Sequence, residues 1–290
     1  MDFKSREKGP ATPVTPKADF RAVEARIARA KKFRGEMGAL RKDDDASSFT
    51  VTRVRRGSSI DLVASCELRP ELGIVFGDWL ANVRASLDYL FFQLAIEDTK
   101  KYPPTRQGSR QFPIKRTLTE FEALRGSDVL HGLSEETIKA IESMQPYHTK
   151  YGAEGNALLW LHDLARMDRH REPFKMGTLI KNWKGTAHQV DGVKPLGFDT
   201  QDPTKSPLVV GAGETLLLGT LRCASEADAM NQEPGIELSV DCDLEAIDWY
   251  RDTHRKGISA NIRNDTLEER MKFVEDYMGL VVAHFKKTHG

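Results

Sequence analysis

The chain has 290 residues, of which 39% are hydrophobic and 30% are charged, and its formal net charge at pH 7 is zero. This length suffices for a full hydrophobic core, and the composition excludes an intrinsically disordered chain. The balanced total charge gives no general indication of a nucleic-acid partner. Residues 1–60 nevertheless contain 15 Lys or Arg against 8 Asp or Glu, which indicates either an anionic partner or a solvated helix surface.

Cysteine usage and hydropathy predict a cytoplasmic protein. Cys66, Cys223 and Cys242 are scattered and form no Cys-x-x-Cys pair, which is typical of buried thiols in a reducing compartment. No apolar run approaches the roughly 18 residues needed to cross a bilayer, so we expect no membrane contact. Residues 1–17 are polar and contain prolines, and we expect them to form a disordered tail rather than a secretory signal.

The first half of the chain is predicted to be mainly helical. Residues 18–42 repeat apolar residues at steps of three and four, which predicts an amphipathic helix. The alternating stretch FTVTRVRRGSSIDLVASCEL predicts a β-hairpin that turns at Gly57, Ser58 and Ser59. A long helix is expected near 71–97. After a charged loop, LTEFEAL and LSEETIKAIESMQ predict two shorter helices, and a further helix is expected over 156–171.

In the second half of the chain the spacing of the apolar residues changes. FKMGTLIKNW, PLVVGAGETLLLGTLR and GIELSVDCDL predict strands separated by turns. Residues 266–287 predict a closing helix with a capping box made by Thr266 and Glu269. The expected fold is therefore α+β, a bundle of about five or six helices with an N-terminal hairpin and a mostly antiparallel sheet before the last helix. We expect one domain over 18–290, with a helical core (18–172 and 244–290) and an inserted β region (173–243).

Two charged residues stand out on the helix near 71–97, because this helix is apolar on most of its circumference and is therefore expected inside the protein. Arg84 and Asp88 are four residues apart and are expected to pair with each other. On the helix 156–171, Asp168 falls in the apolar face, so it also requires a cation, either Arg84 or Arg171. The predicted polar centre comprises Arg84, Asp88, Asp168, His170 and Arg171, and it either binds a phosphate or only ties two helices together.

Four motifs in this region occur in a fixed order: GDWLANVRASLDYL, QFPI, MQPY and DRHR. They resemble a group of uncharacterised bacterial proteins whose usual wording is G-(D/E)-x-L-H-N-L-R-S-A-L-D-H-L, F-P-I, Q-P-Y and D-K-H-R. The resemblance covers residues 77–171, and this chain departs from it at Ala81, Tyr89 and Arg169. It implies a family and no established activity.

An arginine followed after four to six residues by a histidine, on a helix of a small bundle, is also similar to the HEPN-type nucleases. This similarity implies metal-independent RNA cleavage in which Arg84 stabilises the phosphate. Tyr89 occupies the histidine position, and a tyrosine with a pKa of about 10 is a poor base at neutral pH. His170 would replace it only if the fold brings it beside Arg84. The candidate catalytic residues are therefore Arg84, Tyr89 and His170, and RNA or nucleotide binding without catalysis is the favoured variant.

Two alternatives remain open from the sequence. ALLWLHDLAR resembles the His-Asp step of HD-type phosphohydrolases, in which His162 and Asp163, with His131 and either Asp168 or Asp191, would hold a metal ion. The other alternative is a structural or interaction protein without a cofactor. The heptad steps of the last helix are compatible with a homodimer.

Overall fold

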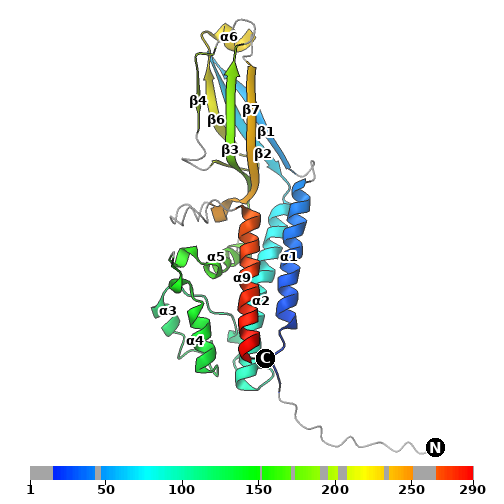
Figure 1. Cartoon of the computed structure of the whole chain (residues 1–290), viewed down its shortest axis with the longest axis vertical. Helices are drawn as coiled ribbons and strands as arrows, with labels where there is room; N and C mark the ends of the chain where they lie inside the picture. Colours follow the sequence, from blue (N-terminus) through cyan, green and yellow to red (C-terminus); the bar gives the residue numbers. More distant parts are fainter. Residues whose placement is uncertain are drawn as a thin grey trace, which may run out of the picture.

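The computed structural model of this chain describes residues 16–42, 47–150, 152–170, 174–189, 195–201, 208–231, 235–250 and 266–289; the side chains of residues 168–170 are not described. The molecule is elongated, with strands at one end and a bundle of helices at the other (Figure 1). The α+β class, the hairpin near the N-terminus and the sheet before the last helix are confirmed. The predicted tail lies almost entirely outside the described residues and stays a prediction.

Three long helices form the centre of the bundle, and α2 lies between α1, α5 and α9. Residues around most of its circumference are buried, as expected for an interior helix. α1 begins at Arg21 rather than at residue 18, and the backbone amides of Ala18 and Asp19, which precede it, donate to side chains of α2. The helices are α1 (Arg21–Lys42), α2 (Glu71–Thr99), α3 (Leu118–Glu122), α4 (Glu135–Ser143), α5 (Ala157–His170), α6 (Glu226–Asn231) and α9 (Leu267–His289), with short 3-10 turns at Gln107–Ser109, Pro146–His148 and Ala153–Gly155.

The predicted hairpin turns at the expected place. Gly57 has a φ of +57°, a left-handed conformation that glycine adopts without steric cost, and it leaves a two-residue connection between the paired strands. The short strand β4 and the helix α6 were not predicted, because neither segment has a long hydrophobic period. The strands are β1 (Ser47–Arg56), β2 (Ser59–Leu68), β3 (Met176–His188), β4 (Gly197–Thr200), β5 (Leu208–Gly211), β6 (Thr215–Arg222) and β7 (Gly235–Ala246).

The strands form two antiparallel sheets, in the orders β1-β2-β6-β4 and β5-β3-β7. The sheets pack face to face through apolar residues such as Leu62 on β2, Trp183 on β3 and Leu218 on β6, which gives a β-sandwich. The sequence grouped the hairpin with the helical core. In the structure β2 pairs with β6, so the hairpin forms one sheet with β4 and β6 of the inserted β region.

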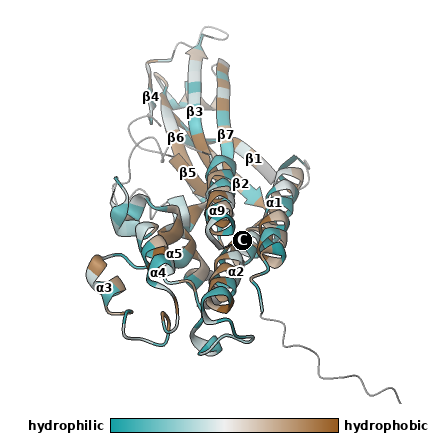
Figure 2. Ribbon diagram, turned by 60° about the horizontal axis from the view of Figure 1, so that its bottom comes forward, coloured by the Kyte–Doolittle hydropathy of each residue, from teal (hydrophilic) through white to brown (hydrophobic). Residues whose placement is uncertain are grey.

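The main hydrophobic core joins the helices to the base of the sandwich. It includes Phe76 and Trp79 of α2, Trp160 of α5 and Trp249, which follows β7. In Figure 2, brown segments run along β5 and β6, whereas much of α1 is teal. None of the described helices is long and apolar enough to cross a lipid bilayer.

The last helix begins with the predicted capping box. The amide of Thr266 donates to Glu269 Oε2 at 2.7 Å, and the amide of Glu269 donates to Thr266 Oγ1 at 3.1 Å. α9 packs on both α1 and α2. Arg34 of α1 donates to Glu275 of α9 through Nε, at 3.1 Å from each carboxylate oxygen.

Candidate functional site

Arg84 lies at the wall of a pocket of about 420 Å³, formed where α2, the segment 108–115 and α5 meet. The residue as a whole is only 8% exposed, so its charge is largely removed from water. The pocket is lined by Arg84, Gly108, Ser109, Gln111, Phe112, Pro113, Ile114, Lys115, Leu124, Val129 and His162.

The predicted pair of Arg84 and Asp88 is confirmed, with Arg84 Nη2 at 2.9 Å from Asp88 Oδ1. Both residues also hold the backbone of Phe112: Arg84 Nη2 donates to its carbonyl at 3.0 Å, and its amide donates to Asp88 Oδ1 at 2.9 Å. The motifs N-x-R-x-x-L-D and F-P-I therefore meet at one residue. One turn of α2 fixes the start of the segment that forms the pocket.

The Q-P-Y motif holds the other end of that segment. Gln145 is 1% exposed; its Nε2 donates to the carbonyls of Pro113 and Ile141, and its Oε1 accepts from the amide of Lys115 at 2.8 Å. Three of the four motifs thus converge on residues 112–115. Gln145 was absent from the predicted site, although its place in an ordered motif was the signal that identifies it.

Replacing Gln145 with alanine is expected to lower the free energy of unfolding by about 2–4 kcal/mol, because it leaves the buried carbonyl of Pro113 and the partly buried amide of Lys115 without partners. Urea denaturation of the variant measures this change. The exposed Gln111→Ala, in the same segment, is the control and is expected to stay within about 0.5 kcal/mol of the wild type. Equal stabilities of the two variants would contradict the proposal that the hydrogen bonds of Gln145 hold residues 113–115 in place.

His162, on α5, lines the same pocket as Arg84. Burial and then the positive charge of Arg84 lower the pKa of His162 below its ordinary value of 6.5, although Asp163 opposes the shift. The imidazole is therefore neutral at neutral pH. Lys115 supplies a further cation, and its ammonium group makes no hydrogen bond or ion pair within the described part of the chain.

Asp163, predicted to accompany His162 as a metal ligand, is engaged elsewhere. Arg116 donates to Asp163 Oδ2 at 2.5 Å through Nη2, and its Nη1 donates to Glu154. This ion-pair network ties α5 to the segment that precedes α3. The two neighbours on α5 therefore point to different surroundings, as their 100° separation on a helix requires.

Tyr89 is not brought to Arg84. Its hydroxyl accepts from Arg26 Nη2 at 3.1 Å, and the guanidinium of Arg26 lies 5.2 Å from the centre of its ring. Tyr89 thus faces α1, since five residues along a helix turn a side chain by about 140°. The tyrosine that occupies the histidine position of the HEPN-like pattern therefore lies outside the pocket.

The remaining predicted residues are only partly described. Asp168 and His170 belong to the last turn of α5, but their side chains lie outside the described part of the chain, as do Arg171 and Asp191. Their assignment to the polar centre stays a prediction. His131 is exposed in a turn, where its carbonyl accepts from Arg110.

The described residues contain no group of three or more His, Cys, Asp or Glu side chains placed to hold a metal ion. Because Asp168 and Asp191 are not covered by that statement, the HD-like arrangement stays a prediction. Cys66, Cys223 and Cys242 are free thiols, and the first two are buried as predicted.

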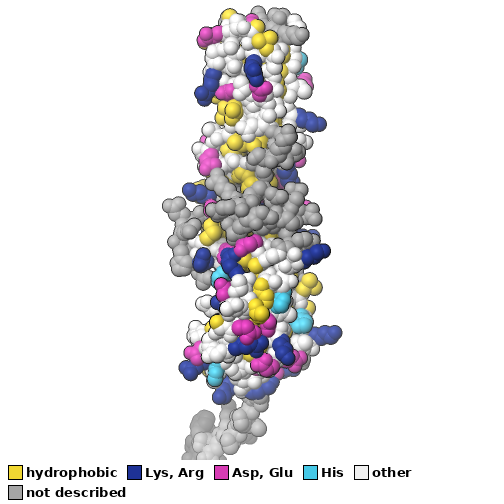
Figure 3. Space-filling model, turned by 90° about the vertical axis from the view of Figure 1, so that its left-hand side faces the viewer, with side chains coloured by type: hydrophobic (Ala, Val, Ile, Leu, Met, Phe, Trp, Pro, Cys, Tyr) yellow, Lys and Arg dark blue, Asp and Glu magenta, His cyan; other side chains and the backbone are white. Residues whose placement is uncertain are grey.

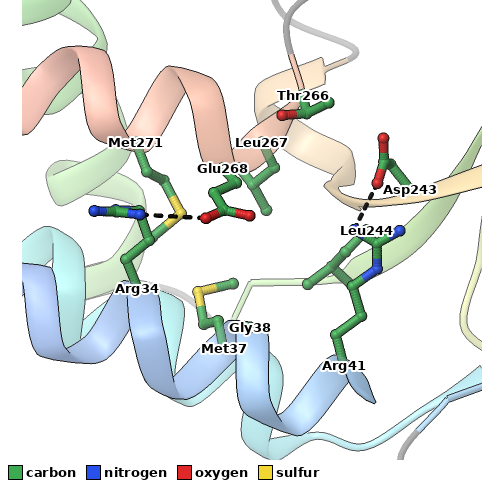
Figure 4. A pocket seen from close by; sticks show the side chains of 10 residues that line it. All are labelled: Arg34, Met37, Gly38, Arg41, Asp243, Leu244, Thr266, Leu267, Glu268 and Met271. Atoms are coloured by element: carbon green, nitrogen blue, oxygen red, sulfur yellow. Dashed lines mark hydrogen bonds and ion pairs between the residues drawn. The ribbon is translucent and has the colours of Figure 1, made fainter.

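A second pocket, of about 160 Å³, lies between the end of α1 and the start of α9 (Figure 4). Its charged side chains are paired with one another: Arg34 contacts Glu268 at 3.3 Å, and Arg41 contacts Asp243 at 2.5 Å. Two cations against two carboxylates give no preference for an anion. The Arg84 pocket is therefore the stronger candidate for a functional site.

Comparison with protein-family models, with curated proteins and with solved structures gives no match to this chain.

Proposed function

We propose that the chain binds a phosphate group of RNA or of a nucleotide in the Arg84 pocket. One observation carries the proposal: Arg84, Lys115 and His162 line the same hollow, and no acidic side chain is among the described residues that line it. Asp88 does not line the pocket, but it neutralises part of the charge of Arg84. Lys115 is then the cation of the pocket that makes no ion pair within the described part of the chain. Such a site favours a small anion that can accept several hydrogen bonds.

The chain around the pocket is rich in basic residues, several of which are already paired: Arg106 with Asp128, Arg116 with Glu154 and Asp163, and Arg125 with three glutamates. Residues 99–131 contain seven Lys or Arg against three Asp or Glu. Figure 3 looks onto the side of the molecule that carries α3, α4 and α5, where Lys and Arg side chains alternate with Asp and Glu. Because the outer surface is mixed in charge, the preference for phosphate belongs to the pocket itself.

The HEPN-like analogy supports the same class of ligand. In that analogy the arginine of α2 stabilises a phosphate, which is the role proposed here for Arg84. The free thiols of Cys66, Cys223 and Cys242 suit the reducing cytoplasm in which such a ligand occurs.

The first test measures binding to fluorescently labelled single-stranded RNA by anisotropy, with ATP titrated calorimetrically in a separate arm to distinguish the two sources of phosphate. Lys115→Ala is expected to weaken binding about tenfold or more without changing the melting temperature, since the ammonium group has no partner inside the described structure. Lys139→Ala, an exposed lysine on α4 outside the pocket, is the matched control. Equal losses in both variants, or no binding by the wild type, would refute the proposal.

Binding is expected to strengthen as the pH falls below 6.5. A bound anion attracts the protonated imidazole and offsets the positive charge of Arg84, and it therefore raises the pKa of His162 again. By linkage, protonation of His162 then strengthens anion binding over the same range. RNA without a terminal phosphate is the suitable ligand, because its phosphodiesters do not titrate there. His162→Gln is expected to abolish the pH dependence, and an unchanged pH profile in that variant would contradict it.

A second candidate function is metal-independent RNA cleavage, favoured by the neutral imidazole of His162 beside Arg84. His162 would accept the 2′-hydroxyl proton, in place of the tyrosine that faces α1. Incubating the labelled RNA with the protein in EDTA tests this function. Cleavage that disappears in His162→Gln would support it, and intact RNA bound by the wild type would leave binding alone.

A further inference from the structure

The outer face of α9 carries two of the most exposed large hydrophobic side chains among the described residues. Leu280 is 71% exposed and Phe273 is 55% exposed. Seven residues separate them, so they lie on the same side of the helix, with Tyr277 partly buried beside them. The opposite face of α9, which includes Met271, is packed in the main core. A second apolar stripe at heptad spacing is typical of a helix that contacts another helix.

A groove of about 470 Å³ between α1 and α9 borders this face. Gly279, Val282 and Ala283 form its α9 wall, and Ile27 and Ala28 line it from α1. Gly279, Ala283 and Ala28 have small side chains, which allow another helix to approach closely on this side. Gly279 and Ala283 lie about 60–100° round the helix from Leu280, so the groove lies at the edge of the exposed stripe.

The exposed charges of α9 identify the direction of that partner helix. Glu269 lies in the first turn and Lys287 in the last, and both are exposed. A parallel copy of α9 would place Glu269, Asp276 and Lys287 each beside the same charge. An antiparallel copy places the acidic first turn beside the basic last turn and leaves only the two Asp276 side chains facing each other. A two-fold axis generates this antiparallel arrangement from two identical chains.

We propose that the chain forms a homodimer in which α9 packs antiparallel against α9 of a second copy. Phe273 of one protomer contacts Leu280 of its partner, and the reciprocal contact follows from the two-fold axis. Asp276 and Tyr277 lie midway between these residues along the helix and therefore lie next to the axis. This interface is on a different face from the Arg84 pocket, so the two proposals fail or hold independently.

Sedimentation velocity at about 10–100 µM protein tests the dimer. The wild type is expected to sediment as a dimer, and Leu280→Asp is expected to raise the dissociation constant by about 100-fold or more, because it places a charge against Phe273 of the partner protomer. Met230→Asp, on α6 and 59% exposed, is the matched control and is expected to stay dimeric. A monomeric wild type at 100 µM would overturn the proposal and leave this face for another partner. A dimer that Leu280→Asp does not weaken would overturn it as well.

Cysteine cross-linking tests the geometry of the pair. Asp276→Cys is expected to form a disulfide-linked dimer under mild oxidation, because the two copies of this residue lie beside the axis. Ala22→Cys, on the exposed side of α1, is expected to remain unlinked, and the unmodified chain measures the background from its three native thiols. A dimer in which Asp276→Cys does not cross-link would overturn the antiparallel pairing.

Discussion

Replacing Arg270 with methionine is expected to lower the free energy of unfolding by about 3–5 kcal/mol, a large share of the stability of an ordinary domain. Arg270 of α9 and Glu245 of β7 form a hydrogen-bonded ion pair, and their side chains are 1% and 0% exposed. The substitution leaves the carboxylate of Glu245 buried without its cation. Because the pair connects a strand of the sandwich to a helix of the bundle, its loss also weakens the contact between the sandwich and the bundle.

A matched comparison separates burial from charge. Arg125 contacts Glu122, Glu135 and Glu142, but its side chain is 33% exposed, so Arg125→Met is expected to cost less than about 1 kcal/mol. The double variant Glu245→Leu with Arg270→Met is expected to recover most of the lost stability, since it removes both buried charges. Urea denaturation measures all three variants. An Arg270→Met variant as stable as Arg125→Met would contradict the assigned role of the buried pair.

The cost of Arg270→Met is expected to depend on pH. Burial raises the pKa of Glu245, against the opposing effect of Arg270, so removing the arginine raises this pKa further. The folded variant then retains a proton that the unfolded chain releases once the pH exceeds the ordinary glutamate value of 4.5. Its stability therefore falls as the pH rises through that range. The deficit relative to the wild type is expected to shrink as the pH falls, because at low pH Glu245 carries a proton in the wild type as well. A deficit that does not change with pH would contradict this explanation.

Replacing Arg84 with alanine is expected to have two effects, loss of phosphate binding and a destabilisation of roughly 2–4 kcal/mol. The guanidinium lines the pocket and also donates to Asp88 and to the carbonyl of Phe112. Its removal leaves Asp88, whose side chain is 28% exposed, without this ion pair. Thermal melts and RNA anisotropy on the same samples measure both effects.

The double variant Arg84→Leu with Asp88→Leu distinguishes the two roles of Arg84. It is expected to regain part of the stability, because no charge stays unpaired, but to bind RNA no better than Arg84→Ala. If the double variant bound RNA as tightly as the wild type, the arginine would only tie α2 to residues 112–115. In that event Arg84 and Asp88 have only a structural role, which favours the alternative of a structural or interaction protein.

Local patterns predicted the elements that depend on nearby residues. The stripe of α9, its capping box and the turn at Gly57 each follow from residues within one or two turns of chain. The pairing of β2 with β6 could not be predicted, because it joins residues at least 150 positions apart and no local pattern specifies a strand's second neighbour. The hairpin was therefore assigned to the helical core rather than to the sandwich.

The candidate site also contains some features that local patterns predict and others that they do not. The pair of Arg84 and Asp88 follows from their spacing on one helix, whereas the contact of both with Phe112 requires the path of a loop that has no period. His162 was considered only as a metal ligand, since nothing in the sequence placed it across a pocket from Arg84. Tyr89 was assigned to the site by analogy, and the packing of α1 on α2 directs it to Arg26.

The buried pair of Glu245 and Arg270 shows a further limit of sequence analysis. In the sequence each is an ordinary charge in a polar stretch, 25 residues from the other. Only the packing of Trp249 under the guanidinium, at 4.6 Å from its ring centre, and the junction of β7 with α9 bury them. Side chains of this kind are normally solvated, so their burial follows from tertiary structure alone.

The most direct test of the central claim is the position of a bound anion in a crystal of the wild-type protein soaked in tungstate, which mimics phosphate and is located by its anomalous scattering. Our account predicts a peak in the pocket, within hydrogen-bonding distance of Arg84 and of Lys115 and beside His162. The same crystals of Lys115→Ala are expected to lose most of that peak. Tungstate bound only at exposed basic residues of α1, with an empty Arg84 pocket, would contradict the proposal.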